Sequence, residues 1–121
     1  MLGSRGSPTF GEIMPTFIAI GYGDVAGYEK TDPAVRERAH AHDADLRGSG
    51  ARMWTSGAPV QVRNPGEAGA SRESGAYMTS SLPVAGFTVL EADDLDHAIT
   101  LVSTTPCAVA HGVVEVWPMN E

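Results

Sequence analysis

The segment 40–45, His-Ala-His-Asp-Ala-Asp, is the densest group of titratable side chains in the sequence. Imidazole is the side chain whose ordinary pKa lies near 7, so His42 is a candidate general acid or base. At helical spacing, His42 shares a face with Val35, Ala39 and Leu46, which predicts an imidazole between a helix and a sheet. The other interpretation is a histidine at the edge of the core, bonded to a backbone carbonyl. The spacing leaves both interpretations open.

A second stripe of the same helical segment carries both signs of charge. It consists of Arg36, His40, Asp43 and Arg47, at positions i, i+4, i+7 and i+11. Charged pairs at this spacing are common on helix surfaces and contribute only about 0.2–0.5 kcal/mol each. We therefore interpret the stripe as a solvated outer face and predict that His40 is a surface residue.

The histidines do not form a metal-binding pattern. Two ligands on one helical face need a spacing of three or four residues, and His40 and His42 are two apart. His42 and Asp45 have a suitable spacing but supply only one carboxylate beside one imidazole. His97 and His111 are remote in sequence. We expect no metal site.

Two further candidates for catalysis lie next to predicted strands. Asp24 follows the first strand, where it either bonds its own turn or orients a histidine. His111 precedes the last strand and is a secondary acid–base candidate. The segment 21–24 is no phosphate loop, because it lacks the lysine and the glycine spacing of one. We expect no cofactor.

Aromatic and hydroxyl side chains are the candidates for holding a substrate. The residues chosen on this basis are Tyr22, Trp54, Ser74, Tyr77 and Phe87. A wall of aromatic surface with few polar groups is typical of pockets for small organic molecules, so we expect an aromatic or polyketide-like ligand. Cys107 has no basic neighbour in sequence and is interpreted as an inert, small hydrophobic residue.

The composition restricts the class of protein. The 121 residues fit one domain, and 42% of them are hydrophobic, which is enough for a core. Eight basic residues face fifteen acidic ones, and no basic run is present, so we expect no nucleic-acid partner. A single cysteine favours a reducing cytoplasm. No apolar run approaches the roughly 20 residues that cross a bilayer, so we expect no membrane association.

Residues 1–13 are rich in Gly, Ser and Pro and contain no apolar segment of a signal peptide. We expect a flexible extension or a cloning remnant there, followed by a single domain over residues 14–121. The preference for Arg over Lys, together with many alanines, suggests a bacterial source.

Local patterns predict the elements that must position these residues. Strands are expected at 16–22, 53–56, 60–63, 87–91 and 113–117, where β-branched and aromatic residues gather. One helix is expected over 33–47, begun by Asp32 and Pro33, and another over about 95–102, capped by Asp93 and ended by Pro106. The segment 67–81 is expected to be a loop, or a weak strand that ends near Tyr77.

This order of elements predicts the fold class. Strand, helix, strands, helix and strand in the pattern β-α-β-β-α-β are typical of an α+β sandwich of the ferredoxin-like type. Both helices must then cover one face of the sheet. The other face is left open, so we expect a homodimer that forms through it.

Three segments resemble the YCII-related family, in particular its branch named for an Asp-Gly-Pro-Phe motif. They are FIAIGYGDVAGY near the start, VAGFTVLEADDLDHAI in the second half and HGVVEVWPM near the end, and the resemblance extends over about residues 15–119. It implies a dimeric αβ-barrel type of ferredoxin-like fold. It also implies a site for small, often aromatic or chlorinated molecules, with a His–Asp pair that transfers protons.

The chain departs from the family pattern in two places. Ser74-Gly75-Ala76-Tyr77 stands where the family has Asp-Gly-Pro-Phe, so the carboxylate of that motif is absent. Ala39 stands where family members commonly have a histidine, and His42 lies about 4.5 Å further along the helix axis.

The sequence therefore supports two hypotheses of function. The first is a cofactor-independent enzyme of secondary or aromatic metabolism, an isomerase, lyase or cyclase. In it His42 is the acid or base, and Asp24, Ser74, Tyr77 or His111 orients the substrate. The alternative is a non-catalytic module of the same fold that binds a small molecule.

Overall fold

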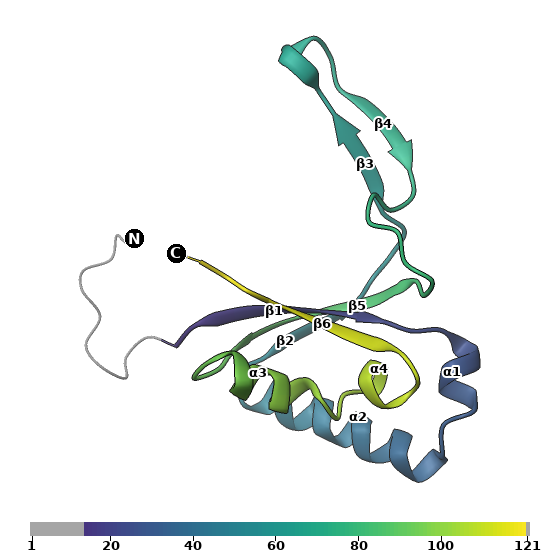
Figure 1. Ribbon diagram of the computed structural model, residues 1–121, viewed down its shortest axis with the longest axis vertical. Coiled ribbons are helices and arrows are strands. Elements are labelled where there is room, and N and C mark those ends of the chain that lie inside the picture. The colour runs from purple at the N-terminus through teal and green to yellow at the C-terminus, as the bar shows by residue number, and fades with distance from the viewer. Residues whose placement is uncertain (1–13, 121) are drawn as a thin grey trace.

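The computed structural model describes residues 14–120, and Figure 1 shows a sheet with the helices gathered on one of its sides. The sheet has four strands, β1 (Thr16–Tyr22), β2 (Arg52–Thr55), β5 (Val84–Glu91) and β6 (Val113–Pro118). Their spatial order is β2-β5-β1-β6, and every neighbouring pair is antiparallel. The expected extension over residues 1–13 lies outside the described residues.

Strand β1 lies in the interior of the sheet because its residues favour burial on both faces. Its sequence TFIAIGY combines β-branched, aromatic and small residues, as a strand with two neighbours requires. Ala19 pairs with Thr88 of β5 on one side and with Val116 of β6 on the other. Residues paired in this way share a face of the sheet, so all three side chains point toward the helices.

The long helix α2 (Pro33–Gly48) confirms the prediction of a helix after Asp32. The Asp32 carboxylate accepts a hydrogen bond from the backbone N–H of Ala34 at 2.8 Å, and Pro33 occupies the first helical position. Ala39 and Leu46 are its buried residues. They are seven positions apart, so one narrow line of the helix points at the sheet.

The second predicted helix, α3 (Leu95–Val102), has its cap one residue later than expected. Asp94, and not Asp93, is its N-cap, because the Asp94 backbone is extended and its carboxylate accepts from the N–H of His97. Pro106, expected to end this helix, instead begins a further one, α4 (Pro106–Val109). The four residues of α4 and the five of α1 (Val25–Glu29) are too few to show helical periodicity in a sequence.

The core lies between the sheet and the helices. Its buried cluster consists of Phe17, Ala19, Leu90, Ala92, Ala98 and Val102. Three come from β1 and β5, two come from α3, and Ala92 follows β5 directly. Helices packed on one side of antiparallel strands make this an α+β architecture, as the sequence predicted.

A separate hairpin interrupts the sheet between β2 and β5. Strands β3 (Val60–Arg63) and β4 (Ser71–Ser74) pair antiparallel, with a short 3-10 helix η1 (Pro65–Glu67) between them. The segment expected as a loop or weak strand thus supplies β4. Figure 1 shows that the hairpin projects away from the sheet, on the side opposite to the helices.

The face of the sheet opposite to the helices is aromatic and open. Trp54, Phe87 and Trp117 keep 49%, 39% and 46% of their surface exposed there. Glu115 is fixed among them, because its Oε1 accepts hydrogen bonds from the Tyr22 hydroxyl at 3.0 Å and from Trp117 Nε1 at 2.9 Å.

Over residues 14–120, no helix combines the length and apolar composition that a membrane span needs.

Candidate functional site

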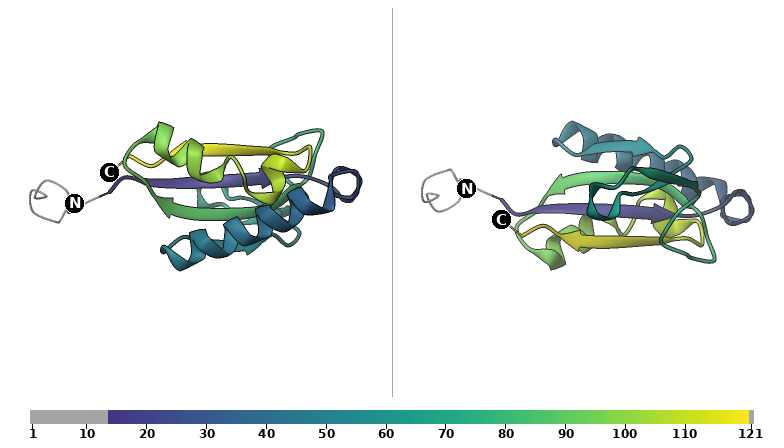
Figure 2. Two further views of the ribbon diagram at one scale, coloured as in Figure 1. Left: turned by 90° about the horizontal axis from the view of Figure 1, so that it is seen from below. Right: turned by 90° about the horizontal axis from the view of Figure 1, so that it is seen from above.

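A cavity of about 780 Å³ lies between α2 and the helix-facing side of the sheet. Its floor is formed by small and apolar residues of the strands, Ala19, Gly21, Met53, Thr88 and Val114. Its walls come from α1, α2 and the segment around α4. In Figure 2, α2 runs along the sheet beside the chain of α3 and α4.

The charged stripe of α2 lines this cavity. Arg36, His40, Asp43 and Arg47 all border it. Asp43 is half-buried, so the interpretation of the whole stripe as a solvated outer face is wrong, whereas His40 is exposed, as predicted. With 3.6 residues per turn, these four residues lie about 40–100° to one side of Ala39, the most buried residue of the helix, so they face the flank of the sheet contact.

His40 is joined to α1 by a hydrogen bond. Its Nε2 lies 2.9 Å from the hydroxyl oxygen of Tyr28, and the two rings are tilted with centroids 5.9 Å apart. The guanidinium carbon of Arg36 lies 4.7 Å from the centroid of the same Tyr28 ring. Tyr28 thus holds a cation on its face and an imidazole at its hydroxyl, and all three residues line the cavity.

Asp43 is one turn further along α2 and is electrostatically unusual. Its Oδ1 is buried and has no hydrogen-bond partner among residues 14–120. Burial raises the pKa of the Asp43 carboxyl, and the charges of Arg47, His40 and His42 oppose that shift without cancelling it. A carboxylate in this state is more basic than one on the surface, which is a property of catalytic bases.

Cys107 borders the same cavity next to β1. Burial raises the pKa of its thiol, and the negative charge of Asp43 raises it further, so the thiol stays protonated at neutral pH. A Cβ atom at Gly21 would lie 2.8 Å from the Cys107 Sγ. Glycine at position 21 is therefore needed for the sulfur to reach the sheet.

His42 does not line the cavity. Its Nε2–H donates a hydrogen bond to the backbone carbonyl of Leu101 in α3, and the ring is half-buried. This is the second of the two interpretations that the sequence left open. The cause is the rotation of α2, since His42 lies about 60° to the other side of Ala39 and so faces α3.

Of the other catalytic candidates, Asp24 borders the cavity and His111 does not. Asp24 is the N-cap of α1, where its Oδ1 accepts from the N–H of Gly27 at 2.8 Å. His111 is exposed and adopts a φ of 63°, between α4 and β6. Both residues therefore shape the chain at turns.

The aromatic and hydroxyl candidates are divided among three places. Trp54 and Phe87 border the cavity, but strand alternation directs their side chains to the open face, opposite to Met53 and Thr88. Tyr22 is buried at that open face against Glu115. Burial, together with the hydrogen bond and the charge of Glu115, raises the pKa of the Tyr22 phenol.

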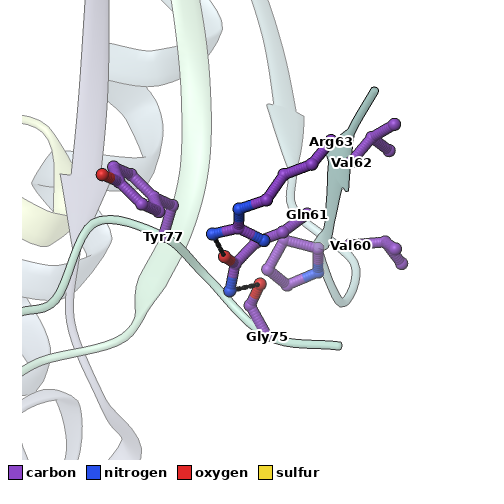
Figure 3. Close-up of a pocket in the computed structure, with 7 residues that line it drawn as sticks. Val60, Gln61, Val62, Arg63, Gly75 and Tyr77 are labelled. Atoms are coloured by element: carbon purple, nitrogen blue, oxygen red, sulfur yellow. Dashed lines mark hydrogen bonds between the residues drawn. The ribbon is translucent and has the colours of Figure 1, made fainter. Parts of the chain in front are cut away.

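Ser74 and Tyr77 belong to the projecting hairpin. A shallow groove of about 420 Å³ there is lined by Tyr77 and by β3, and Figure 3 shows its side chains. Arg63 Nη2 donates to Gln61 Oε1 at 2.8 Å, and Gln61 Nε2 donates to the carbonyl of Gly75 at 3.2 Å. The groove contains no histidine or carboxylate, so it offers no acid–base pair.

The structure therefore brings together a different set of residues from the one selected by sequence. The cavity combines His40, Asp43, Tyr28 and Arg36, and of the earlier candidates only Asp24, Trp54 and Phe87 border it. The regular i, i+4, i+7, i+11 spacing of the charged stripe was the signal that could have found it. Within the described range 14–120, no group of three His, Cys, Asp or Glu side chains could hold a metal ion.

Comparison with known proteins adds no relative: no protein-family model matches the chain, and no curated protein matches it.

Proposed function

We propose that this protein catalyses cofactor-independent proton transfer on a small organic molecule bound in the cavity between α2 and the sheet. Asp43 is the base and His40 the second acid–base group. The observation that carries this proposal is the buried Asp43 Oδ1, which has no partner among the described residues and belongs to a carboxyl whose pKa is raised. Leaving such an oxygen without a donor costs about 1–3 kcal/mol, so a substrate that supplies a proton relieves that cost.

The chemistry follows from the groups around Asp43. Its carboxylate removes a proton from carbon next to a carbonyl, and the electron pair of the C–H bond moves to the carbonyl oxygen. The hydroxyl of Tyr28, whose oxygen lies 2.9 Å from Nε2 of His40, is the donor for that developing negative charge. His40, one turn away on the same helical face, donates a proton to a second carbon while the electron pair on oxygen re-forms the carbonyl, which completes an isomerisation. Asp43 then gives its proton to solvent and His40 takes one up. Loss of a leaving group from the same intermediate makes the reaction a lyase reaction.

The ferredoxin-like fold and the YCII-related family remain part of this proposal. The strand order β2-β5-β1-β6, with helices on one side, supports a ferredoxin-like sandwich with a hairpin inserted after β2. A His–Asp pair at the site also agrees with the family resemblance, although His40 and Asp43, and not His42, are the residues concerned. The lone thiol of Cys107 supports a reducing, cytoplasmic setting in a bacterium.

We also propose a homodimer that forms through the open face of the sheet. Support comes from the exposed Trp54, Phe87 and Trp117 side chains, which form an apolar surface around a Glu115 that is already hydrogen-bonded. Replacing Phe87 and Trp117 by Glu should convert a dimer into a monomer in light scattering. A wild-type protein that is monomeric at every concentration would rule the dimer out.

A binding module without catalysis is the second candidate. Its support is the Ser74-Gly75-Ala76-Tyr77 segment, which carries no carboxylate and lies on the hairpin, away from the cavity. Proton exchange separates the two candidates. Small carbonyl compounds that bind in the cavity, as shown by NMR shifts of its residues, should exchange a carbon-bound proton with D2O if the protein is an enzyme. Binding without exchange supports the module.

A further inference from the structure

Among residues 14–120, the two arginines that border the cavity, Arg36 and Arg47, make no ion pair, but the charge of Arg47 acts on the neighbouring Asp43. Arg36 borders the cavity, and among residues 14–120 the ion pairs are Arg63 with Glu73 and His97 with Asp93. No carboxylate in that range comes within salt-bridge distance of the Arg36 guanidinium. Its five N–H donors also have no hydrogen-bond acceptor among the interactions of the described chain. A half-buried guanidinium in this state is available to an acceptor that is not part of the protein.

The position of this guanidinium is nevertheless fixed. It lies over the face of the Tyr28 ring, 4.7 Å from the centroid, and the Tyr28 hydroxyl is bonded to His40. A guanidinium that lies over a ring face keeps N–H groups that can donate to another acceptor. The N–H edge of Arg36, the Tyr28 hydroxyl and the His40 ring therefore form one polar end of the cavity.

The carboxylates near this end do not neutralise it. Asp24 and Glu29 also border the cavity, but the Asp24 Oδ1 is used as the N-cap of α1, and among residues 14–120 neither carboxylate makes an ion pair with Arg36. Asp43 lies two turns further along α2, where burial raises the pKa of its carboxyl. Away from the polar end, the floor is apolar, with Ala19, Met53 and Val114. A guanidinium at one end, beside an apolar floor, fits a molecule with an anionic head and an unsaturated body.

We propose that the substrate of the cavity is an organic anion, an aromatic or unsaturated carboxylate whose carboxylate group is held by Arg36. The inference rests on the proposed function for the location of the site, and it adds the chemical class of the ligand. The carboxylate head accepts from the Arg36 N–H edge. The body then extends over the floor toward Cys107, past Asp43, where the reacting carbon lies.

The test uses two probes that differ only in charge, 2-naphthoate and 2-naphthamide. Their dissociation constants are measured by NMR titration of the wild-type protein, Arg36→Met, Arg36→Lys and Arg38→Met. Arg38 is exposed on α2 and does not border the cavity, so its substitution is the matched control for loss of one positive charge. Thermal unfolding of each variant shows whether the fold is retained.

We expect 2-naphthoate to bind the wild-type protein at least about tenfold more tightly than 2-naphthamide, because a hydrogen bond between two charged groups is stronger than one to a neutral amide. Arg36→Met should remove that difference and leave 2-naphthamide binding unchanged, whereas Arg36→Lys should keep part of it and Arg38→Met all of it. Equal binding of the two probes to the wild-type protein, or no detectable binding of 2-naphthoate at its solubility limit, would overturn the inference. An equal effect of Arg36→Met and Arg38→Met would overturn it as well.

The two proposals can fail separately. Arg36-dependent binding of 2-naphthoate without any proton exchange on bound carbon acids would keep the anion site and remove the enzyme. Proton exchange that depends on Asp43 but not on Arg36 would keep the enzyme and remove the anion site.

Discussion

The hydroxyl oxygen of Tyr28 in α1 lies 2.9 Å from Nε2 of His40 in α2, and both residues line the same cavity. This contact makes Tyr28→Phe an informative variant, because phenylalanine keeps the ring under Arg36 and removes only the hydroxyl. We expect proton exchange on a bound carbonyl compound to fall about tenfold or more, since one donor to the developing oxyanion and one partner of His40 are lost. Binding of 2-naphthoate should change little. A variant with wild-type exchange rates would show that the hydroxyl has no part in the reaction.

Asp43→Asn tests the electrostatic cost of the buried carboxyl. Burial raises the pKa of Asp43 above its ordinary 3.8, so the folded protein binds this proton more tightly than the unfolded chain does. The carboxyl therefore lowers stability progressively as the pH rises above about 3.8. The uncharged Asp43→Asn variant should melt at a higher temperature than the wild type at pH 7, by about 4 °C for each kcal/mol gained in the free energy of unfolding.

The pH dependence is the decisive part of that measurement. The advantage of Asp43→Asn should grow as the pH rises from the acid end toward neutrality and be smallest at the acid end, as followed by thermal unfolding. An advantage that shrinks as the pH rises would mean that the carboxylate stabilises the fold through Arg47 and His40.

His42→Ala should affect stability and leave proton transfer intact. The variant loses the hydrogen bond from Nε2–H to the Leu101 carbonyl, which is worth about 1 kcal/mol, and the melting temperature should fall by about 4 °C. His42→Gln, which retains an N–H donor, is expected to recover part of that loss. A large fall in proton exchange for a folded His42→Ala variant would restore His42 as the acid–base residue.

Asp24 should likewise act through the fold. Asp24→Ala removes the cap of α1, for a loss of about 1 kcal/mol, and displaces Tyr28, which belongs to that helix. Asp24→Asn keeps a good capping residue without the charge, so its stability and its exchange rate should both resemble those of the wild type. Loss of exchange in a stable Asp24→Asn variant would show that the carboxylate itself takes part in the chemistry.

Gly21→Ala should fill the cavity floor next to Cys107. The added Cβ would lie 2.8 Å from the Cys107 Sγ, so the sulfur or the strand must move, at a cost of about 1–3 kcal/mol. The double variant Gly21→Ala, Cys107→Ala removes the sulfur and should recover part of the lost stability in chemical denaturation. No recovery would place the strain in the backbone of β1.

The sequence predicted the two longer helices and every strand except β4, which falls in a segment expected as a loop or weak strand, because their signals are local. The run 16–22 has the residues of a buried strand, and Asp32 with Pro33 marks a helix start whatever lies around it. The capping residue of α3 was misplaced by one position, because Asp93 and Asp94 are adjacent and have the same capping chemistry. The helices α1 and α4 have no periodic pattern to recognise.

The site was harder to predict because it depends on the rotation of α2. At helical spacing, the sequence predicts one inward face that carries Val35, Ala39, His42 and Leu46. Only Ala39 and Leu46 are buried. The flank that carries His42 meets α3, and the flank that carries His40 and Asp43 meets the cavity. The packing of each flank is set by contacts between residues far apart in sequence. The flank with His42 depends on α3, and the flank with His40 and Asp43 depends on the sheet. Tyr28 could not be selected for the same reason, since its partner lies twelve residues away in another helix.

The most direct test of the central claim is the rate at which a carbonyl compound bound in the cavity exchanges a carbon-bound proton with D2O, measured by NMR. Wild-type protein is compared with Asp43→Asn, His40→Gln and His42→Gln. We predict exchange by the wild type, a fall of about 10²–10⁴-fold for Asp43→Asn and for His40→Gln, and an unchanged rate for His42→Gln. Exchange that persists in Asp43→Asn, or compounds that bind in the cavity and never exchange, would contradict the account.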